Sequence, residues 1–192
     1  QRGDVRGNDI LIVGDDDFIS VGLALVGGAN SIQVLEIDEK LNNTIRNISE
    51  KEGLDIAVRE YDVQEPLPDA LKGKFDVFVT NPPDSGKGMQ LFVSRCVEGL
   101  KGAGSSGYAD LTHQESLPKK WHEIQQDFLR MNLFPTDIIR QFTRYPEEDG
   151  YWEAEENERM RKKLSFPVQK PDTRWFTASL FRLELADQPN PL

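Results

Sequence analysis

The sequence predicts an α/β protein built around a mostly parallel sheet of seven strands. Short apolar runs typical of buried strands alternate with amphipathic segments that have helical spacing. Polar residues follow nearly every predicted strand, and a charged insertion, with no clear crossover helix, separates the last two strands. Strands that alternate with helices favour a parallel sheet covered on both faces, and the ending favours an antiparallel last strand.

The predicted elements follow one another with clear boundaries. The strands are expected at residues 9–14, 31–38, 55–62, 74–84, 105–112, 135–145 and 174–185. The helices are expected at residues 19–29, 39–53, 88–102, 115–132 and within 147–164, and glycines close the first three. One antiparallel strand at the end of such a sheet is typical of the class I S-adenosylmethionine-dependent methyltransferase-like fold, a Rossmann-like architecture.

Composition narrows the possible functions. The chain has 192 residues and a net charge of -10, which argues against a nucleic-acid partner and is compatible with a cationic ligand. The single Cys96 excludes an internal disulfide framework and favours the reducing cytoplasm. No apolar run approaches the about 20 residues that a membrane helix requires, so no membrane partner is expected.

The end of the first predicted strand carries an unusual loop. Gly14 is followed by Asp15, Asp16 and Asp17, where a dinucleotide fingerprint would have further glycines. Three carboxylates repel phosphates, which makes NAD, FAD and ATP poor candidates, whereas a sulfonium nucleoside with a free ammonium fits. One aspartate could instead cap the following helix, but this role explains one of the three acids and leaves the other two unexplained.

The next two strand ends offer further donor-binding candidates. Glu36 and Asp38 lie where an acid can accept hydrogen bonds from ribose hydroxyls, and Ile37 between them is expected to point into the sheet. Asp38 could equally be the N-cap of the next helix. Asp62 is placed to meet an adenine amino group, with Val63 beside it, although a role as a turn residue explains Asp62 nearly as well.

The fourth strand ends in the motif Asn81-Pro82-Pro83-Asp84. Two prolines fix a stiff, extended turn that can aim the Asn81 side-chain carbonyl and the Pro82 main-chain carbonyl at an amine. Amino-methyltransferases usually have an aromatic residue in the fourth position, which stacks on a planar base. Asp84 cannot stack, but it is suited to holding an aliphatic ammonium.

Together the loop Gly14-Asp15-Asp16-Asp17 and the motif Asn81-Pro82-Pro83 resemble those of the branched-chain polyamine synthases, a group related to spermidine synthases. The stretches "VLEIDE" (34–39) and "DVFVTNPPDS" (76–85) are similar to the corresponding strands of spermidine synthases. The resemblance covers most of residues 1–185.

The resemblance implies aminopropyl transfer. The co-substrate would be decarboxylated S-adenosylmethionine, with no tightly bound cofactor, and the acceptor would be spermidine or a similar linear polyamine. Asp16 and Asp17 are expected at the acceptor nitrogen, with Asn81 and Asp84 completing the catalytic set. Asp15 and Asp84 would hold the flanking ammonium groups, and Pro83 would contact the acceptor.

The resemblance also implies a domain organisation. Residues 1–8 would be the linker from an N-terminal domain that is absent from this chain, 9–185 the catalytic domain and 186–192 a loose tail. Within the acidic insertion 146–164, Tyr151, Trp152 and Glu153 are expected to cover the polyamine as part of a lid, although a solvated charged loop explains them as well. A homodimer is compatible with the sequence.

The remaining candidates carry weaker signals. His113 follows the fifth strand and is predicted to contact the substrate, with a structural histidine as the alternative. No metal site is expected, although clustered aspartates could bind Mg²⁺ or Ca²⁺. Phe92 is predicted to belong to the core face of its helix. The competing functions are an S-adenosylmethionine-dependent amino-group or nucleic-acid methyltransferase and a binding module without catalysis.

Overall fold

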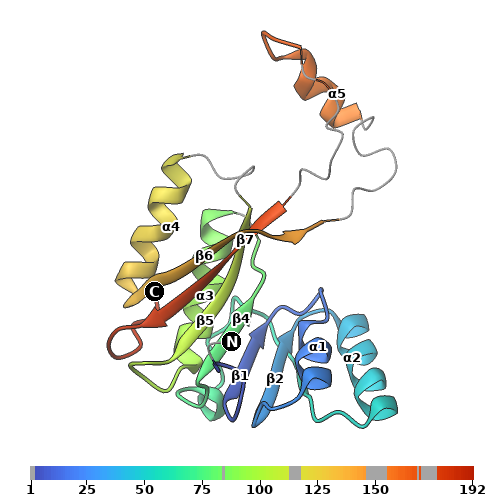
Figure 1. The fold of residues 1–192 in the computed structure, drawn as a ribbon, viewed down its shortest axis with the longest axis vertical. Coiled ribbons are helices and arrows are strands. Elements are labelled where there is room, and N and C mark those ends of the chain that lie inside the picture. Colours follow the sequence, from blue (N-terminus) through green and yellow to red (C-terminus); the bar gives the residue numbers. More distant parts are fainter. Residues whose placement is uncertain (1–2, 84, 113–117, 146–154, 168, 170–176) are drawn as a thin grey trace.

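Seven strands form one sheet in the computed structural model, which describes residues 3–83, 85–112, 118–145, 155–167, 169 and 177–192 (Figure 1). The order across the sheet is β3-β2-β1-β4-β5-β7-β6. The strands are β1 (Asp9–Val13), β2 (Ser31–Glu36), β3 (Ala57–Glu60), β4 (Val77–Thr80), β5 (Ser106–Thr112), β6 (Leu133–Arg144) and β7 (Thr177–Leu185).

The directions of the strands match the sequence prediction. β1 pairs in parallel with β2 and β4, and the parallel arrangement extends to β3 and β5. β7 is antiparallel to both of its neighbours, β5 and β6. The pairs Val13–Leu35 and Val13–Thr80 align the ends of the central strands, so the loops that follow them meet at one edge of the sheet.

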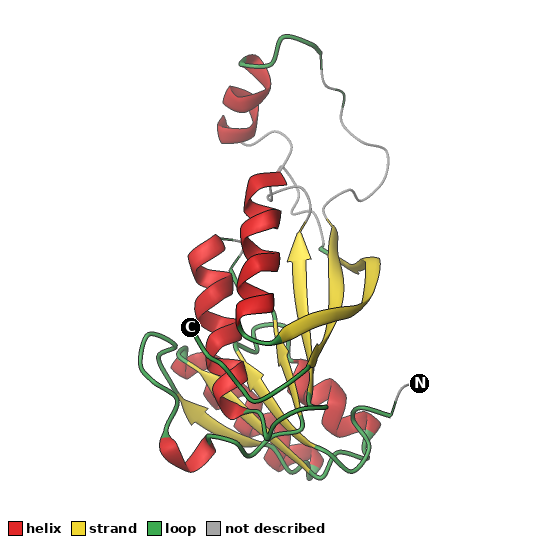
Figure 2. Cartoon of the chain, turned by 90° about the vertical axis from the view of Figure 1, so that its left-hand side faces the viewer, coloured by secondary structure: helices red, strands yellow, loops and turns green. Residues whose placement is uncertain are grey.

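Helices cover both faces of the sheet (Figures 1 and 2). They are α1 (Ile19–Val26), α2 (Glu39–Glu52), α3 (Gly86–Gly99), α4 (Pro118–Arg130) and α5 (Glu155–Lys162), with a short 3-10 helix η1 (Asp69–Leu71). α1 and α2 pack on one face, and α3 and α4 pack on the other. α5 stands beyond the end of the sheet, away from both layers (Figure 1).

The apolar run of β1 is explained by burial on both faces. Leu11 and Val13 point toward the α3 side, while Ile10 and Ile12 point toward the α1 side, as the two-residue period of a strand requires. All four side chains are almost completely buried. At about 25 cal/mol for each Å² of apolar surface removed from water, such strands contribute strongly to folding.

The predicted helix boundaries correspond to real caps. The Asp38 carboxylate accepts hydrogen bonds from the backbone N–H groups of Lys40 and Leu41 at the start of α2, and Gly53 adopts a left-handed conformation at its end. Ser85 caps α3 in the same way through the N–H of Gly88. The helix η1 was not predicted, because three residues give no usable periodicity.

β6 lies at one edge of the sheet and is irregular. Its register against β7 shifts between Pro135 and Asp137 and again between Ile139 and Thr143. Gln141, inside the second shift, has a positive φ of 54°, which is unusual for a residue with a side chain. These features locally interrupt the pairing of β6 with β7.

The first described residues are held against the sheet, and the C-terminal residue is held against α3. Asp4 accepts hydrogen bonds from Tyr108 of β5 (2.5 Å) and from the Arg182 guanidinium of β7 (2.7 Å). Residues 186–192 were expected to be loose, yet Leu192 exchanges two hydrogen bonds with the Ser94 hydroxyl on α3. In the described part of the chain, no helix has the length and apolar character that crossing a bilayer requires.

Candidate active site

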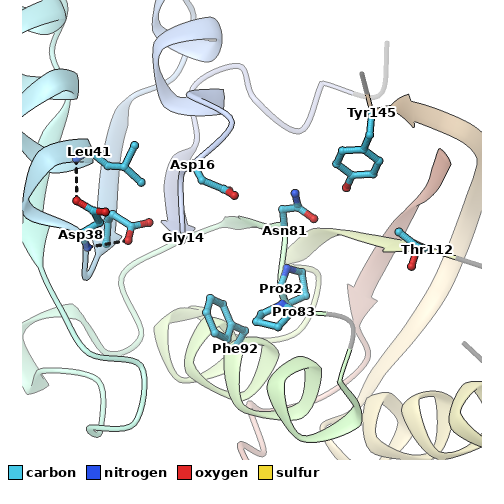
Figure 3. A pocket seen from close by; sticks show the side chains of 11 residues that line it. Gly14, Asp16, Asp38, Leu41, Asn81, Pro82, Pro83, Phe92, Thr112 and Tyr145 are labelled. Carbon is cyan, nitrogen blue, oxygen red and sulfur yellow. Dashed lines mark hydrogen bonds between the residues drawn. The ribbon is translucent and has the colours of Figure 1, made fainter. Parts of the chain in front are cut away.

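A cavity of about 510 Å³ opens at the carboxyl edge of the sheet (Figure 3). The residues around it come from the ends of β1, β2, β4, β5 and β6 and from α2 and α3. They are Gly14, Asp16, Glu36, Asp38, Leu41, Asn81, Pro82, Pro83, Phe92, Thr112 and Tyr145. Seven of the eleven were predicted from the sequence as ligand-binding or catalytic residues, and Thr112 only as the polar end of the fifth strand. The seven are Gly14, Asp16, Glu36, Asp38, Asn81, Pro82 and Pro83.

Gly14 allows the chain to turn sharply at the bottom of the cavity. Its φ of +73° is strained for other residues, and a Cβ built at this position would lie 3.3 Å from the Phe92 ring. The backbone around it is fixed, because the N–H of Gly14 donates to Leu35 O (2.9 Å) and the Thr80 hydroxyl donates to Val13 O (2.8 Å). A ligand can therefore approach the backbone of a rigid turn.

Glu36 organises the loops on both sides of it. One carboxylate oxygen accepts from the N–H of Asp15 (3.0 Å) and the other from the N–H of Asp38 (2.9 Å). A carboxylate oxygen can accept more than one hydrogen bond, so Glu36 keeps capacity for a ligand hydroxyl. Asp38 also borders the cavity, but its side chain is the N-cap of α2, the alternative that the sequence left open.

A smaller apolar cavity of about 60 Å³ adjoins the first and shares Gly14, Glu36 and Phe92 with it. Its other lining residues are Val13, Leu35, Ile37, Tyr61, Asp62 and Val63. The expectation that Ile37 points into the sheet is wrong. β2 ends at Glu36, so the strand alternation no longer applies to Ile37, and this residue is 59% exposed beside the cavity.

Asp62 lies at this cavity within a turn. Its carboxylate accepts the N–H of Gln64 (2.9 Å), and its carbonyl accepts the N–H of Glu65 (3.0 Å). Asp62 is therefore the turn residue that the sequence allowed, and it also lines the cavity next to Val63, as predicted for the donor side.

The three aspartates after Gly14 have different surroundings. Asp15 is buried, and its carboxylate accepts hydrogen bonds from the N–H of Ser20 (3.2 Å) and from the Ser20 hydroxyl. Burial raises the pKa of Asp15, and the hydrogen bonds from Ser20 oppose that rise. Asp15 does not border the larger cavity, so its position favours the helix-anchoring role and not the predicted contact with donor or acceptor.

Asp16 is the member of the triplet that lines the larger cavity, and its carboxylate points toward Asn81 (Figure 3). The chain around the carboxyl shields one side from water, which raises the pKa of Asp16, and the neighbouring Asp17 carboxylate raises it further. Asp17 accepts a hydrogen bond of 2.8 Å from the side-chain amide of Asn81. The amide oxygen of Asn81 is therefore directed away from Asp17.

The Asn-Pro-Pro turn connects the cavity to α3. Pro82 is buried and Pro83 exposed, and both border the cavity. A Cβ on Gly88 in the first turn of α3 would lie 3.1 Å from the Pro83 Cβ and 2.7 Å from the Ser85 hydroxyl. This close packing holds the turn in place, which supports the prediction of a stiff segment.

Some predicted site residues lie outside the described part of the chain: Asp84, His113, Tyr151, Trp152 and Glu153. In turn, the sequence reasoning missed Leu41, Phe92 and Tyr145. Tyr145 directly follows β6, so the rule that strand ends carry ligands could have found it. Phe92 shares a helix face with core residues, and nothing in the local sequence separates it from them.

Within the described ranges, no group of three or more His, Cys, Asp or Glu side chains is arranged to hold a metal ion. Of the two neighbouring acids, Asp16 lines the cavity and Asp17 accepts the side-chain amide of Asn81. What they offer chemically is negative charge, hydrogen-bond acceptance and proton acceptance.

Fold comparison first defines the class. Solved methyltransferase-type proteins share the architecture at low identity: a putative methyltransferase from Bacillus halodurans has a TM-score of 0.67 at 11% identity, over 94% of this chain and 93% of the other. A putative RNA methyltransferase from Pyrococcus horikoshii gives 0.64 at 15% identity, over 96% and 76%. The chain thus has the class I S-adenosylmethionine-dependent methyltransferase fold.

The chain belongs to the branched-chain polyamine synthase family. The family model described as the branched-chain polyamine synthase A C-terminal domain matches residues 1–191. The N(4)-bis(aminopropyl)spermidine synthases of Thermococcus kodakarensis and Methanocaldococcus jannaschii are 37% and 36% identical over 185 residues, 95% of this chain and 51% of each relative. The chain therefore spans about half the length of the curated relatives it matches.

A solved relative carries ligands. The crystal structure of the branched-chain polyamine synthase from Thermus thermophilus, in complex with N4-aminopropylspermidine and 5'-methylthioadenosine, has a TM-score of 0.84 and 33% identity. The match covers 97% of this chain and 53% of the Thermus chain. The family expected from the two sequence motifs is thereby confirmed.

Proposed function

We propose that this chain catalyses the transfer of an aminopropyl group from decarboxylated S-adenosylmethionine to the secondary amine of spermidine or a similar linear polyamine. The products are a branched polyamine and methylthioadenosine. The carrying observation is the cavity itself, which brings Asp16 and Asn81 together with Gly14 and Glu36 at the ends of β1 and β2. Asp17 holds the Asn81 amide from outside the cavity lining. The ligands bound by the Thermus thermophilus relative belong to this reaction.

The donor is assigned to the side of the cavity formed by β1 and β2. Gly14 allows close approach of the nucleoside, Glu36 accepts from the ribose hydroxyls, and the small cavity with Ile37, Val63 and Phe92 takes the adenine. The decarboxylated donor ends in an ammonium, which Asp16 attracts. The parent S-adenosylmethionine has a carboxylate beside the same ammonium, and Asp16 repels this carboxylate. Asp16 therefore favours the decarboxylated donor and disfavours its parent.

The reaction requires a neutral amine next to the sulfonium. The nitrogen lone pair of the acceptor attacks the propyl carbon bonded to sulfur, the C–S bond breaks, and sulfur keeps the electron pair to give neutral methylthioadenosine. The nitrogen then releases a proton, and we assign Asp16 as its acceptor, because this carboxylate lines the cavity and its raised pKa makes it a stronger base than an ordinary aspartate. Asp17 contributes through Asn81, whose amide oxygen is oriented toward the amine.

The acceptor is assigned to the side formed by β5 and β6, where Thr112 and Tyr145 border the cavity with Pro83. The side chains of Asp16, Asn81 and Tyr145 point into the same opening from three directions (Figure 3). Asp84, His113, Tyr151, Trp152 and Glu153 stay predictions for this side. So do spermidine as the preferred polyamine, a homodimer and the cytoplasm as the compartment.

A product assay tests this proposal. The protein is incubated with spermidine and either decarboxylated S-adenosylmethionine or S-adenosylmethionine, and the polyamines are analysed by mass spectrometry. We expect an aminopropyl increment with the decarboxylated donor, located on the secondary nitrogen by fragmentation, together with methylthioadenosine. The alternative, an amino-group methyltransferase, is favoured by the fold neighbours alone. A methyl increment from S-adenosylmethionine with no aminopropyl product would establish that alternative and contradict ours.

A further inference from the structure

The loop from Tyr61 to Leu67 forms one wall of the small apolar cavity. Tyr61, Asp62 and Val63 line the cavity directly, although β3 ends before them at Glu60. Tyr61 still donates its N–H to the Glu36 carbonyl at the end of β2 (3.1 Å), whereas Asp62 and Val63 have no partner in the described strand pairing. Contacts outside the sheet must therefore fix the rest of the wall against which a nucleoside would rest.

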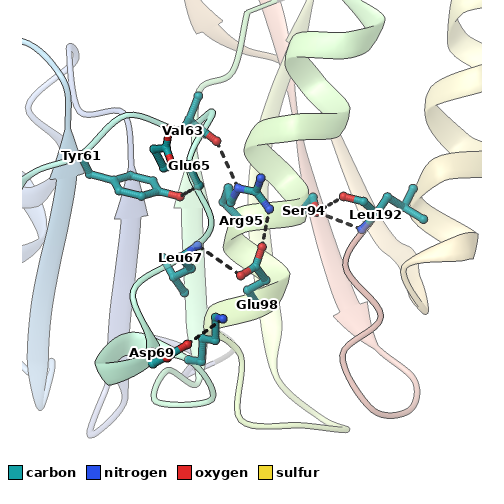
Figure 4. Close-up of polar contacts among 10 residues, drawn as sticks. Tyr61, Val63, Glu65, Leu67, Asp69, Ser94, Arg95, Glu98 and Leu192 are labelled. Carbon is teal, nitrogen blue, oxygen red and sulfur yellow. Dashed lines mark hydrogen bonds and ion pairs between the residues drawn. The ribbon is translucent and has the colours of Figure 1, made fainter.

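Helix α3 supplies that support through one ion pair (Figure 4). The Nε of Arg95 donates to the carbonyl of Val63 at 3.1 Å, and its guanidinium also pairs with the Glu98 carboxylate. The other oxygen of Glu98 accepts the N–H of Leu67 at 3.2 Å. Both ends of the loop are thus tied to two side chains that lie one helical turn apart.

The environment makes this pair different from a surface salt bridge. The side chains of Arg95 and Glu98 are only 14% and 10% exposed. Exposed pairs contribute little because water screens them, whereas charge-assisted hydrogen bonds withdrawn from water are stronger. Each charged group also has a backbone partner in the loop, so loss of either side chain would leave a loop carbonyl or N–H without its bond.

The same face of α3 also reaches the cavity. Phe92, one turn before Arg95, borders both cavities and packs against Gly14. Residues 92, 95 and 98 therefore form a continuous strip, of which Phe92 contacts the ligand space and Arg95 and Glu98 hold its wall. A second polar contact, from the Tyr61 hydroxyl to the carbonyl of Glu65 (2.5 Å), stabilises the loop from within.

We propose that Arg95, held by Glu98, is a positioning residue that sets the affinity for the nucleoside of the donor by fixing the Tyr61–Leu67 loop. Arg95 does not line either cavity, so it acts through Val63. This inference rests on the proposed function, because the donor is what gives the nucleoside cavity its role. We call the Arg95–Glu98 pair with its bonds to Val63 and Leu67 the clamp. Loss of the clamp is expected to weaken donor binding and to leave acceptor binding and the chemical step unchanged.

The test uses Arg95→Met, which keeps most of the apolar stem and removes the guanidinium. Calorimetric titration with 5'-methylthioadenosine is expected to show an affinity about tenfold lower, the scale of one charge-assisted hydrogen bond. The KM for the donor should rise likewise, with kcat and the KM for spermidine unchanged. Hydrogen exchange of the free protein should show faster exchange at Leu67 and its loop neighbours.

Arg130→Met is the matched control. It removes an arginine that pairs with Asp127 three residues away on α4, with Arg130 63% exposed and away from the described cavities of the site. It should leave affinity, kinetics and loop exchange at wild-type values. If Arg95→Met does not fold, the same measurements on Glu98→Gln test the proposal. It keeps an oxygen for the Leu67 N–H while removing the charge that holds Arg95, and it should shift the donor KM in the same direction by a smaller factor.

If hydrogen exchange in the Tyr61–Leu67 loop of Arg95→Met stays at the wild-type rate, Arg95 does not fix this loop, and the proposal is wrong whatever reaction the enzyme catalyses. Faster exchange with unchanged methylthioadenosine affinity would overturn its link to the nucleoside. An equal loss of kcat and of spermidine binding would show a general structural role and overturn the assignment as well. Failure of the proposed reaction would appear separately, in the mass increment of the wild-type product.

Discussion

At the scale of single residues, the three consecutive aspartates have three separate tasks. Asp15 anchors α1 through Ser20, Asp16 faces the cavity, and Asp17 orients Asn81. Adjacent side chains in a turn diverge, so one sequence motif distributes its carboxylates over a buried contact, a ligand space and a neighbouring amide. Three identical residues in the sequence therefore have different roles, and the sequence alone does not distinguish the structural aspartate from the one that faces the ligand space.

Asp16→Asn should lower turnover by about 100-fold or more, the usual contribution of a proton acceptor. The same change should raise the free energy of unfolding at pH 7. Because the folded-state pKa of Asp16 is raised, its ionised form disfavours the folded state above the ordinary pKa of aspartate, about 3.9. The stability difference between variant and wild type should disappear as the pH falls below that value, when Asp16 is protonated in both states.

Initial rates with the decarboxylated donor and urea unfolding at pH 7 and pH 3 measure these effects. Asp55→Asn removes the same charge from an exposed position outside both cavities and should leave turnover unchanged. Asp17→Asn should also reduce turnover severely, because the Asn81 amide would face a neutral amide in place of the carboxylate that orients it. Near wild-type turnover in Asp16→Asn would contradict the assigned role.

The sequence predicted the polar part of the site better than the apolar part. Glu36, Asp62 and Asn81 are recognisable because ligands of open α/β sheets bind at the carboxyl ends of the strands, where these polar residues were predicted to lie. Ile37 and Phe92 are not, since an apolar side chain beside a ligand and one in the core have the same letter. The structure shows that Ile37 lies beside the cavity because β2 ends at Glu36. It shows that Phe92 does so because its ring lies next to Gly14.

At the scale of elements, the packing of β4 against β5 depends on a glycine. Gly107 lies directly opposite Phe78 in the parallel register, and Phe78 is fully buried. A Cβ at Gly107 would lie 2.0 Å from the Phe78 ring, closer than real contacts permit. The core thus places a large ring over a position where a side chain is missing, and this pair joins the two strands that carry Asn81 and Thr112.

Gly107→Ala should lower the free energy of unfolding by about 3 kcal/mol, the upper part of the range for overpacked cores. Gly22→Ala makes the same chemical change in α1, where a Cβ would meet nothing within 4 Å. It should raise the free energy of unfolding by about 0.5–1 kcal/mol, because alanine loses less backbone freedom than glycine in a helix. Urea midpoints compare both variants, and equal midpoints would contradict this account of Phe78.

Element order and type followed from hydrophobic periodicity, while the bounds of the strands did not. The fourth strand, predicted at 74–84, is confined to Val77–Thr80 because Phe75 makes only an isolated bridge and the prolines follow. The sixth begins at Leu133, before Pro135, which an edge position tolerates. Helix ends were more predictable, since Asp38 and Gly53 are local signals that need no tertiary partner.

At the scale of the whole molecule, two tyrosines, the buried Tyr61 and the partly buried Tyr108, link stability to alkaline pH. Burial raises the pKa of Tyr61 to about 12, and burial together with the hydrogen bond to Asp4 raises the pKa of Tyr108 to about 12. In the unfolded chain both ionise near pH 10. Tyr61 supports the loop of the small cavity, and Tyr108 holds the first described residues against the sheet.

The free energy of unfolding should therefore fall between pH 10 and about 12. Above pH 10 the unfolded chain loses the tyrosine protons while the folded chain keeps them, so the unfolded state binds fewer protons and stability decreases with pH. Below pH 10 the two groups contribute no pH dependence. Urea unfolding from pH 8 to 11 measures how steeply the free energy of unfolding falls with pH. The double variant Tyr61→Phe with Tyr108→Phe should show a shallower dependence. Identical slopes would contradict the burial of these groups as its cause.

The antiparallel direction of the last strand was accessible from the sequence. The helix expected within 147–164 lies in a charged insertion and not in a crossover packed on the core, and antiparallel pairing needs no crossover. The docking of the chain ends was not accessible, because Asp4 with Arg182 and Leu192 with Ser94 join residues 178 and 98 positions apart without any shared motif. Such contacts follow from the folded surface and not from a local pattern.

The irregular edge strand β6 also affects how the protein behaves in concentrated solution. A long, straight edge strand offers a row of N–H and C=O groups to any other strand, and Ile138 and Phe142 on β6 are more than half exposed. The register shifts and the left-handed Gln141 break this row into short pieces. Exposed apolar side chains can therefore lie on this edge while intermolecular sheet extension, the first step of amyloid-like aggregation, is disfavoured.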